Sequence, residues 1–193
     1  MKIKNFKITK NEIEFETENV PISYINGLRR TLISEMDVHA IHYMKLDENK
    51  TNLPDDFLAH RIGMLPIRNK TSGFTPSLFL EETNNTENTL HIYSDHLKNE
   101  QGNYIIPSKI FLFSLEPNQS IKMECFVVVG KGKKHSKWSS VSGTRIKNLD
   151  EEDQKFSFQT EICENYDVHS ILLDAISILK KDLTKFQKEN KYI

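Results

Sequence analysis

Apolar and polar residues alternate near both ends of the chain, which is the pattern of β-strands that bury one face. Residues 4–8 and 13–17 alternate on either side of a polar turn at residues 9–11, so the first twenty residues predict a β-hairpin. Residues 156–162 alternate in the same way and predict another strand. The two ends of the chain are therefore expected to contribute strands to the fold.

Two short segments space their apolar residues at three and four positions, as one face of an α-helix does. Residues 21–36 form the first, with Pro21 suited to its first turn. Its expected buried stripe is Ile22, Ile25, Leu28, Leu32 and Met36. Residues 53–62 form the second helix, with Asn52 as the expected cap and Gly63 at its end.

The longest helix is expected from Val168 to about Lys188, where apolar positions repeat at four and three, close to a heptad seam. The seam comprises Val168, Leu172, Ala175, Leu179, Leu183 and Phe186. Additional isoleucines widen the apolar surface beyond this seam. Such a helix needs cover on more than one side, from its own sheet together with another helix or from a second subunit.

The middle of the chain is less regular. Residues 38–46 predict a strand, whereas residues 69–103 are rich in Thr, Asn and Ser and predict a surface loop with short strands at 77–80 and 90–93. The Asn-rich part of this segment is expected to be mobile surface. Residues 110–115 and 121–129 flank a turn and predict a second β-hairpin.

The expected fold class is α+β. The terminal elements, residues 1–48 and 154–193, are expected to form one discontinuous domain in which helices pack on an antiparallel sheet. Residues 49–153 are expected to form an inserted β-rich domain, with an acidic connector at 150–153 leading back to the first domain.

Composition limits the classes of protein that are compatible with this chain. Lys and Arg number 26 against 27 Asp and Glu, so the net charge of −1 does not predict a nucleic-acid or membrane binder. The chain opens on an alternating segment and contains no run of roughly 20 apolar residues, so a soluble intracellular protein is expected. Cys125 and Cys163 stand far apart, which encodes neither a disulfide framework nor a cysteine zinc site. Both are expected to be reduced and buried.

Acidic and histidine pairs offer little catalytic or metal chemistry. His39 and His42 are three residues apart on a predicted strand and point to opposite faces, so a shared metal is not expected. An acid/base enzyme using Asp55, Asp56 and His60 is an alternative, but neighbours on a helix diverge by about 100°. The favourable position of the two aspartates in the first helical turn explains them without catalysis.

Two cationic pairs lie on the predicted helices. Arg29 and Arg30 are side by side on an amphipathic helix, where they provide either fixed donors for a partner or an ordinary solvated face. His60 and Arg61 repeat the pattern of a cationic edge beside apolar residues.

The basic segment 130–143, GKGKKHSKWSSVSG, has three interpretations. A phosphate-cradling loop fails, because the GxxxxGK[ST] spacing is incomplete. A nucleic-acid patch would use four lysines, His135 and Trp138, although there is no repeated aromatic spacing. A structural loop would simply be solvated.

Three segments together resemble a known family. NGLRRTLISEMDVHAI (26–41), LPDDFLAHRIGMLPI (53–67) and SLEPNQSIKMECFVVVGKGKKHSKWSSV (114–141), followed by a heptad-like C-terminal helix, are similar to the alpha-like assembly subunits of multisubunit RNA polymerases. The similarity is to the larger alpha-like subunit of archaeal polymerases and to the third-largest subunit of eukaryotic RNA polymerase II. It extends over nearly the whole chain except residues 71–103.

The resemblance implies a non-catalytic assembly subunit of a DNA-directed RNA polymerase, located in the cell with the transcription complex. The terminal elements would be a dimerisation domain that pairs, through the C-terminal seam, with a smaller alpha-like subunit. Asn26, Arg29 and Arg30 would face the second-largest subunit. The residues that would support contacts to that subunit and to a small zinc-binding adaptor subunit are His60, Arg61, Lys134, His135, Lys137 and Trp138.

The chain also departs from its relatives. Many eukaryotic relatives carry a four-cysteine zinc loop and some archaeal ones an iron–sulfur domain, whereas two distant cysteines supply neither. No metal, cofactor or catalytic residue is therefore expected, nor sequence-specific DNA contact or membrane attachment. The absence of these metal-binding parts and the lysine-rich composition raise the hypothesis of a viral member of the family. The rival function is a free-standing nucleic-acid-binding module that uses residues 131–138.

Overall fold

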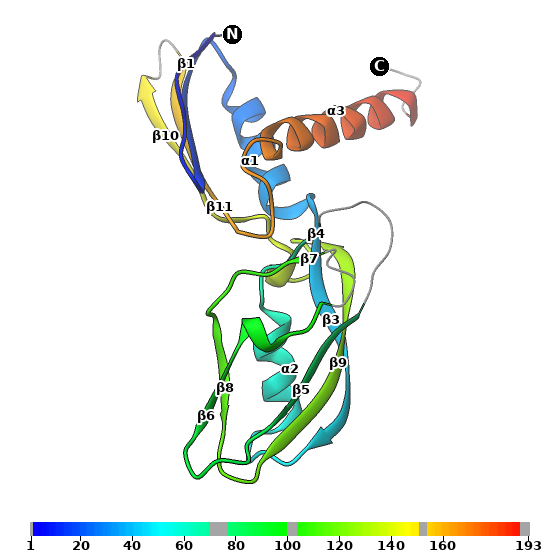
Figure 1. Ribbon diagram of the computed structural model, residues 1–193. Helices are drawn as coiled ribbons and strands as arrows, with labels where there is room; N and C mark the ends of the chain where they lie inside the picture. The colour runs from blue at the N-terminus through cyan, green and yellow to red at the C-terminus, as the bar shows by residue number, and fades with distance from the viewer. Residues whose placement is uncertain (1, 70–76, 100–103, 151–153, 190–193) are drawn as a thin grey trace. The chain divides into compact units, whose positions relative to one another are not determined.

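The structure, a computed structural model, describes residues 2–69, 77–99, 104–150 and 154–189. It is an α+β fold with antiparallel sheets and, within these residues, three α-helices (Figure 1). The chain divides into two compact units. Residues 1–38 and 131–193 form the first, and residues 39–130 form the second.

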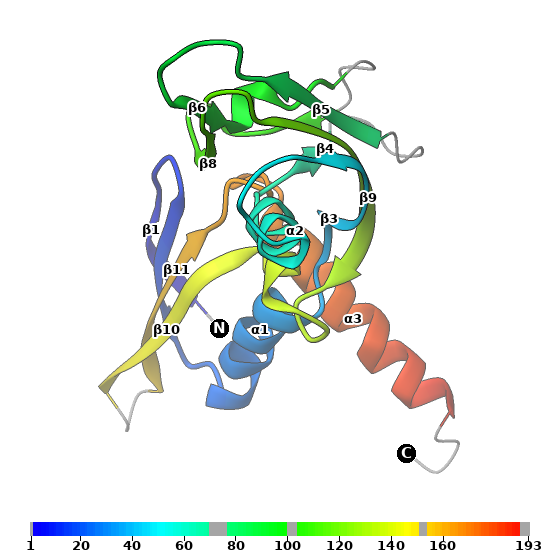
Figure 2. The same ribbon diagram turned by 90° about the horizontal axis from the view of Figure 1, so that it is seen from below.

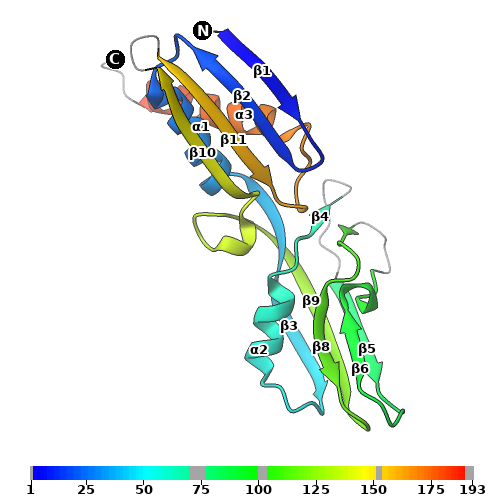
Figure 3. The same ribbon diagram turned by 90° about the vertical axis from the view of Figure 1, so that its left-hand side faces the viewer.

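The first unit is a four-stranded sheet with two helices on one face. Its strands are β1 (Lys2–Ile8), β2 (Glu12–Glu18), β10 (Val141–Asp150) and β11 (Lys155–Ile162), in the order β1-β2-β11-β10 and antiparallel throughout. The helices are α1 (Ile22–Ser34) and α3 (Ile171–Glu189), which lie behind the sheet in Figure 3. The structure confirms the predicted N-terminal hairpin and last strand.

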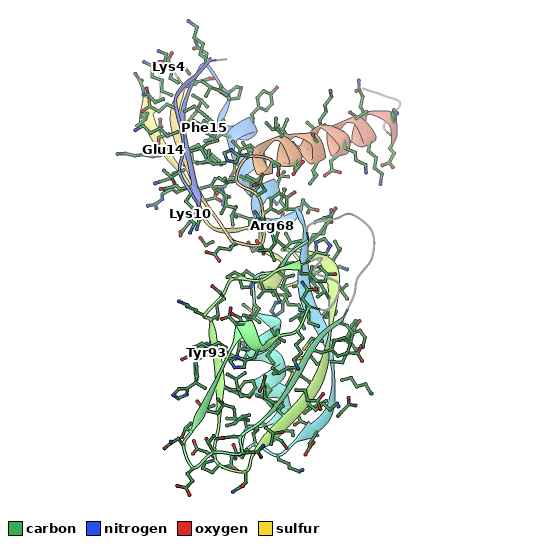
Figure 4. The ribbon with its side chains drawn as sticks, viewed as in Figure 1. Lys4, Lys10, Glu14, Phe15, Arg68 and Tyr93 are labelled. Carbon is green, nitrogen blue, oxygen red and sulfur yellow. The ribbon has the colours of Figure 1, made fainter. Side chains whose placement is uncertain are left out.

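Strict alternation along β2 separates the two faces of this sheet. Ile13, Phe15 and Thr17 are buried, whereas the intervening glutamates are half-buried. Figure 4 shows Phe15 pointing toward the helices and Glu14 pointing to the other side. Phe15 stacks on Phe158 of β11 at 4.9 Å between ring centroids. The helix-facing side therefore forms the core of the first unit.

Strand β10 is not predicted by the sequence pattern. It is an edge strand whose residues are mostly exposed, and its pairing with β11 is irregular near both ends. Only Val141 is fully buried, and Thr144 and Ile146 are partly covered. An edge strand with so little burial lacks the alternation by which strands are recognised. Residues 151–153 of the predicted acidic connector lie outside the described residues.

Helix α1 begins one residue after Pro21 and ends two residues before the predicted end. Ile25, Leu28 and Leu32 are buried as expected. Ile22 is exposed, so its predicted place in the buried stripe is wrong. Met36 is buried but lies beyond the helix, because the chain has already turned toward the next strand.

The second unit is rich in strands. Strands β3 (Asp37–Asn49), β9 (Ser120–Lys131) and β5 (Ser77–Thr83) form a sheet in the order β3-β9-β5. The shorter pairs are β6 (Leu90–Tyr93) with β8 (Phe111–Leu115), and β4 (Arg68–Asn69) with β7 (Tyr104–Ile105). One buried apolar cluster joins these strands to α2 (Asp55–Gly63) and includes Ile41, Leu58, Ile62, Leu80, Ile92, Leu115 and Met123.

Helix α2 starts two residues later than predicted. Its N-cap position is Pro54, which makes no side-chain capping bond, so the expected capping by Asn52 is wrong. Instead Asn49, on β3, donates hydrogen bonds to the Leu53 carbonyl and to Asp55. Leu58 and Ile62 are buried, whereas Phe57 is exposed.

The predicted hairpin over residues 110–129 is wrong. Strand β8 pairs with β6, whereas β9 pairs with β5 and lies beside β3. Asn84, directly after β5, binds the segment that joins β8 to β9. Its backbone pairs with Asn118 and Gln119, and its side-chain amide donates to the Leu115 carbonyl at 2.9 Å. The connecting turn therefore bends from one sheet into another.

The Asn-rich segment lies at the surface as predicted, except that Asn84 is buried and its side chain is held by hydrogen bonds. Asn84 is buried, and its side-chain oxygen accepts bonds from the backbone N–H and hydroxyl of Thr86. Its amide also donates to the Asn88 carbonyl. Residues 70–76 and 100–103 of the same predicted loop lie outside the described residues.

The division between the units differs from the predicted boundaries of 48/49 and 153/154. It falls at 38/39 and 130/131. Most of β3 belongs with the second unit because it pairs with β9 there. Strand β10 belongs with the first unit because it pairs with β11.

Replacing Asn84 tests its role in holding the second unit. Asn84→Ala removes the amide and leaves the Leu115 carbonyl buried without its donor, so we expect the free energy of unfolding to fall by about 2 kcal/mol. Asn85→Ala, at the exposed neighbouring position, should change it by less than about 0.5 kcal/mol. Urea denaturation followed by circular dichroism measures both, and equal effects would contradict this role.

Candidate partner-binding surfaces

The basic loop packs against the C-terminal end of α1. A helix leaves its last carbonyls without partners inside the helix. Here the Ser140 hydroxyl, fully buried, donates to the Leu32 carbonyl at 2.8 Å, and the Lys133 N–H donates to the Ser34 carbonyl at 3.2 Å. The loop is thus a cap for the helix.

Gly132 makes this packing possible. A Cβ at this position would lie 2.0 Å from the Ile33 carbonyl oxygen, and the neighbouring contacts are also backbone atoms. Any side chain would therefore push the loop away from α1. A Cβ at Gly143, in β10, would have no atom within 4 Å.

Lys131 and Lys133 of the loop lie close to carboxylates of the first unit. Lys133 binds Glu35 at 2.8 Å, and Lys131 lies 3.5 Å from Glu35 and 3.9 Å from Asp37. The hydrogen bond from Lys133 holds the pKa of the Glu35 carboxyl below its usual range. Positive charge near the last turn of α1 is also favoured by the helix dipole.

The segment that follows is a short 3₁₀ turn, η2 (Ser136–Trp138), in which Trp138 is buried. His135 accepts a hydrogen bond from the Lys137 backbone through Nδ1 at 3.1 Å. The Lys137 ammonium lies 4.7 Å from the centre of the Trp138 ring, and its partial burial lowers the pKa of Lys137. Trp138 is therefore a core residue and not an exposed stacking platform, whereas Lys134 and His135 are exposed.

The arginine pair lies on the C-terminal half of the same helix. Arg29 donates from Nε to the Asn26 side chain at 3.0 Å, one turn earlier. Arg30 is exposed, and no described residue forms an ion pair with it. The Ser34 hydroxyl binds the Arg30 carbonyl, and the Ser34 carbonyl binds the loop. The arginines and the loop are thus attached to adjacent turns of one helix.

His60 and Arg61 lie in the second unit, on the exposed side of α2. Arg61 donates from Nη2 to the Phe111 carbonyl of β8 at 2.6 Å, which joins the helix to that strand. Asp55, Asp56 and His60 are all exposed, an arrangement that offers no enclosed acid/base site. Within the described residues, no group of three or more His, Cys, Asp or Glu side chains is placed to hold a metal.

The predicted seam on the C-terminal helix is only partly covered. Val168 lies in a turn before α3, which begins at Ile171, so its assignment to the helix is wrong. Ala175 is buried, and Leu179 lies 3.7 Å from the Cβ position of Gly27 on α1. Leu183 and Phe186 are exposed, since the second half of α3 extends away from α1 and the sheet (Figures 1 and 2).

Both cysteines are free thiols. Cys125 is buried as predicted, which raises the pKa of its thiol to about 12. Cys163 is only half-buried, so its predicted burial is wrong. His39 and His42 also differ in exposure, and burial lowers the pKa of His39. No helix in the described ranges is long and apolar enough to cross a bilayer.

The family model for the RNA polymerase Rpb3/Rpb11 dimerisation domain matches residues 14–183. This chain belongs to that family. The match includes α1, the basic loop and most of α3, the elements that carry the predicted binding residues.

Individual relatives support the same family. The chain is 31% identical to the DNA-directed RNA polymerase subunit Rpo3 of Methanocaldococcus jannaschii over 173 residues, which cover 90% of this chain and 87% of the relative. It is 28% identical to the RNA polymerase II subunit RPB3 of Schizosaccharomyces pombe, of which it covers 55%. A conjugation stage-specific protein of Tetrahymena thermophila is 30% identical to this chain, and the match covers 61% of that relative. The chain thus spans somewhat more than half of the latter two relatives.

Sequence reasoning identified the loop but missed what holds it. Gly132, Ser140 and Glu35 were not among the predicted site residues, although they position Lys133 and Trp138 on α1. The available signal was a glycine between two lysines. The sequence alone does not show why a glycine is needed there, and the reason is the close contact of Gly132 with Ile33.

Replacing Gly132 tests whether the loop is a cap. Gly132→Ala places a methyl group against the Ile33 carbonyl, so we expect the free energy of unfolding to fall by about 2 kcal/mol or more. Gly143→Ala has free space and should change it by less than about 0.5 kcal/mol. Thermal and urea denaturation compare the two, and a Gly132→Ala protein as stable as the control would refute the capping role.

Proposed function

We propose that this chain is a non-catalytic assembly subunit of a DNA-directed RNA polymerase, located with the transcription complex. The match of residues 14–183 to the dimerisation-domain family carries this proposal. The buried Trp138 and the pairing of Lys131 and Lys133 with Glu35 argue against the rival function of a free-standing nucleic-acid module. Base stacking on such a loop needs an exposed ring, and the ion pairs with Glu35 compete with phosphate contacts by these two lysines.

Dimerisation is assigned to the first unit, residues 1–38 and 131–193, and the β-rich unit of residues 39–130 is the inserted domain. The proposed partner is a smaller alpha-like subunit, which covers the apolar side of α3. This assignment explains why Leu183 and Phe186 remain exposed in the single chain. Extended exposed apolar surface is typical of obligate interfaces.

The second-largest polymerase subunit is proposed to bind α1 and its capping loop. Arg29 and Arg30 provide donors there, and the exposed Lys134 and His135 extend the cationic surface. Trp138 is buried, and the Lys137 ammonium lies over its ring, so these two residues hold the loop in place. His60 and Arg61 belong to the second unit, and we assign them contacts with the same subunit or with a small zinc-binding adaptor.

Co-expression with candidate smaller alpha-like subunits, followed by size-exclusion chromatography with light scattering, tests the proposed function. We expect a stable heterodimer, which then recruits the large subunits. A chain that remains monomeric with every candidate would refute the proposal.

The apolar side of α3 can be tested without disturbing the core. Leu183→Asp places an unpaired charge in the proposed interface, so we expect heterodimer formation to be lost while the isolated chain keeps its melting temperature. Leu179→Asp is less suitable, because Leu179 also contacts α1. Lys181→Asp, on the opposite side of the helix, is the control and should pair normally.

The arginine pair should affect a later step of assembly. The double change Arg29→Ala and Arg30→Ala should leave the heterodimer intact and weaken binding of the second-largest subunit about tenfold or more. Pull-down of that subunit by the preformed heterodimer measures the effect, with Lys180→Ala as a control on α3. Full recruitment by the double variant would refute the role of these arginines.

A further inference from the structure

The side of α3 that faces away from its apolar residues is lined by lysines. Successive helix positions turn by about 100°, so the residues of the second half of α3 separate into two sides. Leu179, Leu183 and Phe186 lie on one side. Four lysines lie on the other side, within an arc of roughly 140°. We call this set the lysine face, which comprises Lys180, Lys181, Lys185 and Lys188.

The lysine face is open to solvent. All four side chains are exposed, and together with neighbouring residues of α3 they line a hollow of about 620 Å³. Two hydroxyl groups lie between the lysines, those of Ser177 and Thr184. They donate hydrogen bonds to the carbonyls of Leu173 and Lys180, both at 2.8 Å, so they are turned back onto the helix. The charged groups therefore dominate this surface.

Two acidic residues border the same hollow without neutralising it. Asp182 lies toward the capping loop, because the pKa of Lys133 is raised first by its hydrogen bond to Glu35 and also by the charge of Asp182. Glu189 lies 3.8 Å from Lys185, and both side chains are well exposed. An exposed pair of this kind contributes little. The lysine face therefore keeps a net positive charge.

The helix dipole does not account for this cluster. The dipole favours cations in the last turn of a helix. Helix α3 ends at Glu189, whereas the lysine face begins more than two turns earlier, at Lys180. The chain as a whole has a net charge of −1, so the positive charge is a local feature of this side of α3.

We infer that the lysine face is a binding surface for the phosphate backbone of double-stranded DNA. A duplex carries about one negative charge per 1.7 Å of its axis. The lysine face extends roughly 12 Å along α3, so it can face several phosphates at once. Lysine ammonium groups act as point charges without the fork that recognises a base edge, so the contact is independent of sequence.

The composition of the lysine face favours a duplex over other anionic partners. Protein–protein interfaces are depleted in lysine and enriched in aromatic residues, methionine and arginine. Single-stranded nucleic acids are held by base stacking on aromatic rings as well as by charge. The arc of the lysine face contains no aromatic or aliphatic residue from position 180 to 188, since Leu183 and Phe186 lie on the other side.

This inference goes beyond the proposed function, and the two place different partners on opposite sides of α3. The smaller subunit is proposed to cover the side with Leu183 and Phe186, which leaves the lysine face directed away from it. The surface is also separate from the capping loop, where Lys131 and Lys133 lie close to Glu35. A polymerase that contains this subunit acts on duplex DNA, so the ligand is present wherever the assembled enzyme works.

Replacing the lysine face with glutamine tests the inference in the full chain. The quadruple change Lys180→Gln, Lys181→Gln, Lys185→Gln and Lys188→Gln removes the charges and keeps good helix-forming residues. We expect affinity for a short fluorescent DNA duplex at low salt, measured by anisotropy, to fall about tenfold or more. The slope of log affinity against log salt should fall by about 3, because each phosphate contact contributes about 0.9.

A second quadruple variant controls for overall charge. It replaces four exposed lysines of the second unit by glutamine, namely Lys45, Lys98, Lys109 and Lys122. The net charge changes by the same amount, so affinity for the duplex should change less than about twofold if the lysine face is the binding surface. Both variants should keep the wild-type melting temperature, because the replaced side chains are exposed.

Several outcomes would overturn the inference. They are a wild-type chain that does not bind the duplex at low salt, equal losses in the two quadruple variants, tighter binding to a single-stranded RNA of the same length, and equally effective competition by polyglutamate. Pairing with the smaller subunit is measured separately and should be unchanged in the lysine-face variant, whose apolar side is intact. Failure of the wild-type chain to pair would count against the proposed function alone.

Discussion

The last carbonyls of α1, which have no hydrogen-bond partner inside the helix, are the constraint on which the first unit depends. Leu32 and Ser34 receive hydrogen bonds from a loop that is a hundred residues later in the chain, and Gly132 allows that loop to touch Ile33. Glu35 then draws in Lys131 and Lys133. Because the loop is held in this way, β10 follows it directly into the sheet. The cap therefore connects the helix that carries the arginine pair to the sheet beneath it.

The first unit has a buried apolar core at its centre, whereas apolar side chains at its margins remain exposed. Phe15 and Phe158 stack under the helices, but the row of aromatic and aliphatic residues continues through Phe6 onto an uncovered strand. Helix α3 shows the same feature, since Ala175 is buried and Phe186 is not. The centre of the unit is therefore packed within this chain, whereas apolar side chains on β1 and on the second half of α3 remain exposed.

In the second unit, a buried asparagine holds two segments together beside the apolar core. The Asn84 side-chain oxygen accepts a hydrogen bond from Thr86, and its amide donates to the Asn88 carbonyl and to the Leu115 carbonyl at the end of β8. Strands β8 and β9 do not form a hairpin and enter different sheets, and these hydrogen bonds hold the segment between them. Burial of a polar group is favourable only when its hydrogen bonds are made, and here they are made by residues thirty positions apart. The polar composition of the segment conceals this role.

The sequence by itself determined the elements whose signal is local. Alternation identified the N-terminal hairpin and β11, and helical spacing identified α1, α2 and α3, because both patterns record which side of a single element is buried. The order of the NGLRR, HRIGMLPI and KHSKW segments also indicated the family. Tertiary structure alone decided the partners of β8, the existence of β10, the start of α3 after Val168 and the division of the loop cations into engaged and exposed sets. Asn84, Gly132 and Glu35 each contact residues far away in the chain, and periodicity carries no record of such contacts.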